Sequence, residues 1–275
     1  MKCTVGRVVS GNGPLVVLVH SSASGRRQWR SLPAALEDRF TVVALDLLGY
    51  GDTPAWTEPR PQQLSDQSAL IHAVAEDVGA PLALVGHSFG ASVALCAAAE
   101  LGDRLVGLIL LEPNPFSLLR EAGAPEYDEA AALRDAVKAA GDAGAWPEAA
   151  ERFADYWNGP GTWQAMPAER RDAFARALRP NYHEWDAVLA APAARYVAAV
   201  TASTNVVSAR DTVAPIAGIV AILEQLRPDW TFTRIDSGGH MVPLTRPEAV
   251  NRVVAGALDD LVARGGQLSS TSPAR

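Results

Sequence analysis

Short apolar runs recur through the first half of the chain. They cover residues 15–19 (LVVLV), 41–45 (TVVAL), 82–85 (LALV) and 105–111 (LVGLILL). A strand that is buried on both faces carries such a continuous apolar run, and strands of this kind occur mainly in parallel sheets. We therefore expect these segments to be strands of one central sheet.

Helical patterns separate these runs. Residues 70–78 place apolar side chains on one helical face, and Gly79 follows as a stop signal. Residues 93–101 repeat the pattern and are followed by Gly102. Strands that alternate with helices predict an α/β fold, with a mostly parallel sheet and helices on both faces.

Residues 113–195 interrupt this alternation and show no clear buried strand. They are rich in Ala, Arg and Glu, and they hold Trp146, Trp157, Trp163 and Trp185. We interpret this stretch as a helical cap inserted into the fold. We predict a core formed by residues 1–112 and 196–264, a cap of 113–195 and a flexible tail of 265–275.

The α/β alternation resumes after residue 195. Residues 204–208 form a weak strand pattern, 216–226 a helix and 230–235 a strand. The final helix opens at residues 245–248 (TRPE), with capping-box spacing and a proline near the first helical position. A glycine-flanked histidine lies between the last strand and this helix.

The most specific motif is Gly86-His87-Ser88-Phe89-Gly90, which follows a predicted buried strand and opens a predicted helix. A serine on such a turn needs small neighbours, and the helix N-terminus behind it favours developing negative charge. We therefore predict that Ser88 is a nucleophile. His240, between Gly239 and the last helix, is the expected base, because a serine hydroxyl needs a proton acceptor.

Two carboxylates are candidates for orienting the imidazole. Asp211 follows the weak strand, and Glu112 directly follows the strand of residues 105–111. Both fit the chain order of serine, then acid, then histidine, so both stay open, with Asp211 preferred. An oxyanion hole needs two N–H donors, and we expect them from Phe89 and Ser22. The expected substrate-binding residues are Ser21, His87, Trp157, Trp185 and Met241.

These motifs, together with residues 46–51 (DLLGYG), resemble the α/β-hydrolase superfamily in order and over nearly the whole chain. The resemblance implies an α/β-hydrolase fold with a mostly parallel eight-stranded sheet and a helical cap after strand 6. Ser21 departs from the pattern, since such proteins usually carry glycine after the histidine of this loop. Glu112 lies where one branch of the superfamily places its acid.

The resemblance implies a serine hydrolase that acts on a small carboxylic ester through an acyl-enzyme, without a cofactor or metal. We expect the ester to have a hydrophobic part, because the Trp and Tyr residues of the insertion favour an apolar pocket over Ser88. A cofactor-free perhydrolase or haloperoxidase, a lactonase and a carbon–carbon bond hydrolase use similar sites and stay open. A small-molecule receptor on a hydrolase fold is a more remote alternative. The pattern of residues leaves the substrate undefined.

Composition narrows the expected partners. The chain has 275 residues and a formal net charge of -7, so it lacks the basic excess that attracts nucleic acid. No apolar run approaches the roughly 18 residues of a membrane helix. Two distant cysteines, Cys3 and Cys96, do not form a disulfide framework. We expect a cytoplasmic monomer or homodimer that binds a small-molecule substrate and neither nucleic acid nor a membrane.

Overall fold

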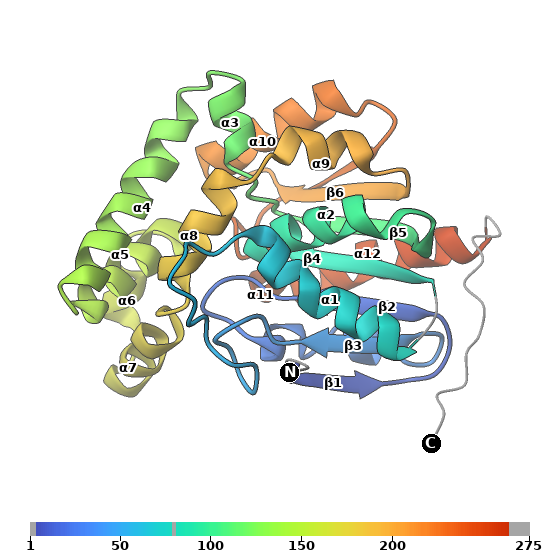
Figure 1. Cartoon of the computed structure of the whole chain (residues 1–275), viewed down its shortest axis with the longest axis horizontal. Coiled ribbons are helices and arrows are strands. Elements are labelled where there is room, and N and C mark those ends of the chain that lie inside the picture. Colours follow the sequence, from blue (N-terminus) through green and yellow to red (C-terminus); the bar gives the residue numbers. More distant parts are fainter. Residues whose placement is uncertain (1–3, 79–80, 264–275) are drawn as a thin grey trace.

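A computed structural model describes residues 4–78 and 81–263 of the chain. Cys3, the predicted helix stop at Gly79 and the predicted tail of residues 265–275 lie outside the described residues. Figure 1 shows a central sheet with helices packed against its faces and a group of helices beside one edge. The arrangement is the predicted α/β fold.

The sheet has seven strands within the described residues, one fewer than expected, in the order β1-β3-β2-β4-β5-β6-β7. Only β1 is antiparallel, and it pairs with β3. The strands are β1 (Arg7–Ser10), β2 (Leu15–Val19), β3 (Thr41–Leu45), β4 (Leu82–His87), β5 (Leu105–Leu111), β6 (Ser203–Ala209) and β7 (Thr231–Ile235). The segments that were predicted as strands therefore all form strands, with ends that differ by at most two residues.

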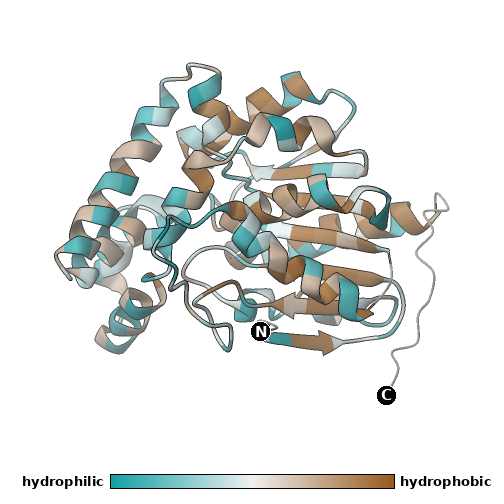
Figure 2. Ribbon diagram, viewed as in Figure 1, coloured by the Kyte–Doolittle hydropathy of each residue, from teal (hydrophilic) through white to brown (hydrophobic). Residues whose placement is uncertain are grey.

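The sheet separates two layers of apolar packing. One layer joins alternate residues of the strands, such as Val17, to α1 (Leu64–Val78), α2 (Phe89–Leu101) and α10 (Ala214–Leu226). The other joins residues such as Val16 to the segment 29–40, which contains short 3-10 helices, and to α12 (Pro247–Ala263). Burial on both faces explains why the inner strands are apolar throughout. Figure 2 shows these strands as the apolar centre of the fold.

All the described helices between α2 and α10 lie between β5 and β6. They are α3 (Ser117–Glu121), α4 (Glu126–Asp142), α5 (Trp146–Asn158), α6 (Thr162–Ala165), α7 (Ala168–Ala177), α8 (Asn181–Ala190) and α9 (Ala193–Ala199). We call residues 113–202 the insertion. Its last helix crosses residue 195, so the helical stretch runs a little further than the predicted cap. The division of the chain into core and cap stays a prediction.

Parallel strands bring distant loops to one place. Because β2, β4, β5, β6 and β7 run in the same direction, their carboxyl ends meet at one edge of the sheet. Figure 1 shows α4 to α8 beside this edge. In α/β sheets, ligand sites form at this edge. None of the helices within residues 4–78 and 81–263 combines the length and the hydrophobicity needed to cross a bilayer.

Candidate active site

Ser88 occupies a strained turn between β4 and α2. Its backbone has φ 54° and ψ -119°, a left-handed conformation that costs a non-glycine residue free energy. The two flanking glycines are required by close packing. A Cβ atom on Gly86 would lie 2.4 Å from the carbonyl oxygen of Gly90, and one on Gly90 would lie 2.4 Å from the carbonyl oxygen of Val19. The turn therefore needs the glycines of the motif, as predicted.

His240 lies beside Ser88 in the folded chain, although 152 residues separate them in sequence. The His240 Nε2 atom is 2.8 Å from the Ser88 hydroxyl oxygen. Both side chains are buried. His240 lies in the loop after β7, and its ring packs in a tilted orientation against Trp157, with 4.1 Å between ring centroids. A hydroxyl and an imidazole at this distance can exchange a proton.

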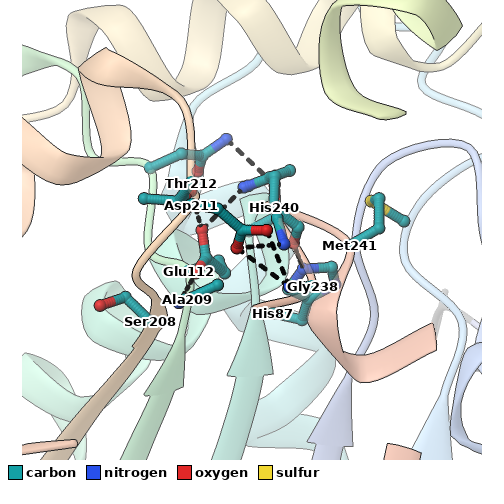
Figure 3. A network of polar contacts seen from close by, with 12 residues as sticks. His87, Glu112, Ser208, Ala209, Asp211, Thr212, Gly238, His240 and Met241 are labelled. Atoms are coloured by element: carbon teal, nitrogen blue, oxygen red, sulfur yellow. Dashed lines mark hydrogen bonds and ion pairs between the residues drawn. The ribbon is translucent and has the colours of Figure 1, made fainter. Parts of the chain in front are cut away.

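The second nitrogen of His240 faces Glu112. The His240 Nδ1 atom is 3.4 Å from the Glu112 Oε2 atom, and the Glu112 side chain is fully buried. The carboxylate also accepts hydrogen bonds from the Ala209 backbone N–H at 2.5 Å and from the Thr212 hydroxyl. Figure 3 shows Glu112 held in this network beside His240. A carboxylate in this position accepts the Nδ1–H and leaves Nε2 free to take a proton from Ser88.

Asp211, the preferred acid candidate, has a different set of partners. Its exposed carboxylate accepts hydrogen bonds from the backbone N–H groups of Gly238 at 2.9 Å and Gly239 at 2.8 Å. The bond from Gly239 is the main cause of a lowered pKa of Asp211. The hydrogen bond to His240 is thus formed by the alternative candidate, Glu112. The strand register contributes to this, because Leu111 pairs with His87, and Glu112 and Ser88 are the next residues of the two neighbouring strands.

Three non-glycine residues within the described part of the chain have positive φ: Ala23, Ser88 and Glu112, at 56°, 54° and 48°. All of them belong to loops that end strands at the same sheet edge. Strained backbone of this kind costs about 1–3 kcal/mol per residue and persists where the surrounding structure holds it. Its concentration here makes this edge the candidate functional site.

The two predicted oxyanion donors are free. Neither the Phe89 nor the Ser22 backbone N–H has a hydrogen-bond partner among residues 4–78 and 81–263. Both residues line a small cavity together with Ser88. Unpaired backbone N–H groups next to a nucleophile are the donors that an oxyanion requires.

The cavity above Ser88 lies between the sheet edge and the insertion, and its volume of about 10 Å³ is roughly the space for one water molecule. Its lining residues are Ser22, Ser88, Phe89, Asn114, Phe153, Trp157, Asn181, Glu184, Trp185 and Val188. The predicted substrate-binding residues Trp157 and Trp185 are therefore part of the wall. A single charged side chain, Glu184, is among the residues that line it.

A wider cavity, which we call the vestibule, lies next to the first and shares Ser22, Phe153 and Trp157 with it. Its apolar lining includes Met166, Phe174, Leu244 and Met241, the last of which was predicted to bind substrate. Three exposed arginines, Arg27, Arg30 and Arg170, also line the vestibule. The vestibule is large enough for the part of a substrate that the inner cavity cannot hold.

Ser21 and His87 line neither cavity. The Ser21 hydroxyl donates to the Gln28 side chain at 2.6 Å and holds the loop after β2. His87 Nε2 donates to the backbone carbonyl of His240 at 2.9 Å and so supports the loop that carries the imidazole. Burial lowers the pKa of His87 to about 3, so its ring is neutral. Both residues support the loops of the site, and their predicted role in substrate binding stays a prediction.

The sequence interpretation missed Glu184, Asn181 and Tyr50. Glu184 is buried on α8 and accepts hydrogen bonds from the Ser22 hydroxyl at 2.5 Å and from Tyr50 at 2.8 Å. The Tyr50 hydroxyl in turn accepts the Ala23 backbone N–H at 3.0 Å. The insertion is therefore bonded to the loop that carries the predicted oxyanion donor Ser22. Tyr50 belongs to the DLLGYG motif, which was the one available signal.

The chain matches the model of the alpha/beta hydrolase family over residues 16–253. This match spans most of the sequence, and the protein belongs to that family. The fold, the serine turn and the facing histidine agree with the membership. The chain is accordingly a hydrolase of the alpha/beta type.

The relatives have names that indicate different substrates, and solved structures of lower identity share the fold. The chain is 25% identical to a putative carbamate hydrolase of Enterobacter cloacae, over 95% of this chain and 97% of the relative. It is 30% identical to the lipase LipV of Mycobacterium tuberculosis, over 90% and 94%. An esterase of Exiguobacterium antarcticum has a similar fold, with a TM-score of 0.77, 16% identity and coverage of 93% and 95%.

Proposed function

We propose that the protein hydrolyses a carboxylic ester through an acyl-enzyme on Ser88. The observation that supports this most directly is the 2.8 Å contact between the Ser88 hydroxyl and His240 Nε2, beside two unpaired N–H groups. We assign Ser88 as the nucleophile, His240 as the general base and Glu112 as the acid that orients the imidazole. Glu112 replaces Asp211 in this assignment because its carboxylate faces Nδ1.

The proposed reaction has two halves. The Ser88 oxygen bonds to the ester carbonyl carbon while His240 Nε2 takes the hydroxyl proton. The negative charge on the carbonyl oxygen is held by the N–H groups of Phe89 and Ser22. The tetrahedral intermediate then expels the alcohol, which receives the proton from Nε2. Water repeats the sequence on the acyl-enzyme and releases the acid.

The hydrophobic part of the substrate is assigned to the vestibule. Phe153, Trp157 and Phe174 offer it aromatic contacts there, and burial of apolar area contributes about 25 cal/mol per Å². His240 directly precedes Met241, which lines the vestibule and not the inner cavity, so we place His240 on the vestibule side. A leaving group must receive its proton from His240, so we place the alcohol in the vestibule.

The proposed function is tested by active-site labelling. A fluorophosphonate probe should label Ser88, as identified by mass spectrometry of the digested protein. Ser88→Ala should lose both the label and the hydrolysis of p-nitrophenyl esters, whereas Ser65→Ala, on α1, should retain both. Unchanged hydrolysis by Ser88→Ala, or a label on another residue, would contradict the assignment.

A further inference from the structure

The cavity above Ser88 contains polar atoms that lack partners. The indole N–H groups of Trp157 and Trp185 and the side-chain oxygen Oδ1 of Asn181 are buried and form no hydrogen bond in the described structure. All three residues line this cavity. Buried polar groups are almost always hydrogen-bonded, so several unpaired ones around one cavity indicate a polar occupant.

Glu184 adds an acceptor to the same wall. It lies three residues after Asn181 on α8, so the two side chains share a helical face. The Oε2 atom accepts from Ser22 at 2.5 Å and from Asn181 Nδ2 at 2.9 Å, whereas Oε1 accepts only from Tyr50, at 2.8 Å. A carboxylate oxygen can accept two hydrogen bonds. One acceptor position on Oε1 is therefore open.

No cation balances Glu184. The described residues form no ion pair with its carboxylate, and only neutral hydrogen-bond donors contact it. Burial raises the pKa of Glu184, and the bonds from Ser22, Asn181 and Tyr50 oppose this effect. A buried carboxyl group without a cation is unfavourable for folding and is retained at sites where it serves binding or chemistry.

The size of the cavity limits what can bind. Its volume of about 10 Å³ holds about one water molecule and is far below the roughly 300–1,000 Å³ of typical ligand sites, so a bound group must displace side chains of the wall. If the alcohol leaves through the vestibule, as proposed above, the acyl part lies in this inner cavity. The acyl part must then be compact, and it meets open acceptors on Glu184 and Asn181.

From this arrangement we propose that the preferred acyl group is small and carries a hydroxyl or amino group close to the ester carbonyl, which donates a hydrogen bond to Glu184. This inference rests on the proposed ester hydrolysis. It assigns Glu184 and Asn181 to substrate recognition, with Trp157 and Trp185 available to donate to an oxygen of the same group. The hydrophobic part of the substrate is thereby confined to the alcohol.

Three phenyl esters of nearly equal size test the proposal: phenyl propionate, phenyl glycolate and glycine phenyl ester. Their acyl chains end in a methyl, a hydroxyl and an amino group, and phenol release is followed for each. Each kcat/KM is divided by the hydroxide-catalysed rate constant of the same ester, which removes differences in intrinsic reactivity. The wild type should then favour the glycolate or the glycine ester over the propionate.

Glu184→Gln should reduce this preference about tenfold or more, because a hydrogen bond to a charged group is lost. A weakened Ser22 loop would slow all three esters equally and would leave the ratio unchanged. Glu58→Gln is the matched control, since it removes an exposed carboxylate and should retain the wild-type ratio. An ammonium group would be distinguished from a hydroxyl by pH, because only the glycine ester loses preference above its amino pKa, near 8.

The possible results separate the two proposals. If the esters are hydrolysed and the propionate is preferred by the wild type, the acyl assignment is overturned and the ester hydrolase proposal stands. An unchanged ratio in folded Glu184→Gln also overturns the assignment. If this variant does not fold, as judged by circular dichroism, the wild-type preference alone decides. If no ester is hydrolysed and the fluorophosphonate does not react, the proposed function itself fails.

Discussion

Replacing Glu112 by glutamine removes one negative charge beside His240 and changes little else in size. The Ala209 N–H still needs a hydrogen-bond acceptor, so the amide oxygen of the glutamine is expected to take the position of Oε1. The amide NH₂ group then faces Thr212 and His240 Nδ1. A donor at this position favours the tautomer with the proton on Nε2, and that tautomer cannot accept the Ser88 proton.

The size of the effect follows from the distance. When His240 becomes protonated, the Glu112 carboxylate, whose Oε2 atom is 3.4 Å from Nδ1, stabilises the positive charge by about 5 kcal/mol at an effective dielectric constant near 20. Loss of this stabilisation corresponds to a fall in kcat of about 10³–10⁴, since each 1.36 kcal/mol is a factor of ten. Substitution of the acid in other serine triads has effects of similar size.

The assay compares Glu112→Gln with Asp211→Asn on one p-nitrophenyl ester. Asp211 is exposed and bonded to backbone N–H groups that an amide oxygen can still partly satisfy. We expect its variant to lose less than about tenfold in kcat. Thermal melting of both proteins shows whether each is folded. A collapse of kcat in folded Asp211→Asn, with Glu112→Gln nearly unaffected, would refute the reasoning.

Three further predictions address support of the site. Burial holds the pKa of His87 at about 3 in the folded protein, against ~6.5 in the unfolded chain. As the pH falls below 6.5, the unfolded chain binds a proton at His87 and the folded protein does not, so the free energy of unfolding decreases until the pH reaches about 3. Urea unfolding should show that the free energy of unfolding falls by about 2 kcal/mol between pH 6.5 and 5 because of His87, and His87→Gln should lack this part of the pH dependence. An equal pH dependence in the variant and the wild type would contradict the prediction. Ser88→Gly should exceed Ser88→Ala in free energy of unfolding by about 1 kcal/mol, because only alanine keeps the left-handed strain; equal urea midpoints would argue against strain. Tyr50→Phe removes the contacts to Ala23 and Glu184 and should lower kcat about tenfold or more; it should also lower the melting temperature, because the Ala23 N–H and Glu184 Oε1 lose their partner, and unchanged kcat would rule out a role for Tyr50 in shaping the loop.

The sequence was sufficient to predict the central strands, because burial on both faces produces continuous apolar runs such as residues 15–19. It was insufficient for β1. This strand is four residues long and lies at the sheet edge, and Val8 and Val9 are 54% and 55% exposed, so no buried pattern marks it. The serine turn and His240 were predictable because glycine spacing and strand context identify them.

The choice between Glu112 and Asp211 could not be made from sequence. Both follow strands at the same sheet edge, and the outcome depends on register and on the left-handed turn at Glu112. Glu184 was beyond prediction for another reason. It meets Ser22 across 162 residues, through packing of the insertion that local patterns do not encode.

The reacting groups are brought together from widely separated parts of the chain. Ser88 and His240 are 152 residues apart, and Glu112 and His240 are 128 apart. A nascent or truncated chain that ends before β7 would contain the serine turn and still lack its proton acceptor. The proposed ester hydrolysis thus requires the last part of the fold to be in place, which would make it a sensitive reporter of complete refolding in experiments where spectroscopic signals recover earlier.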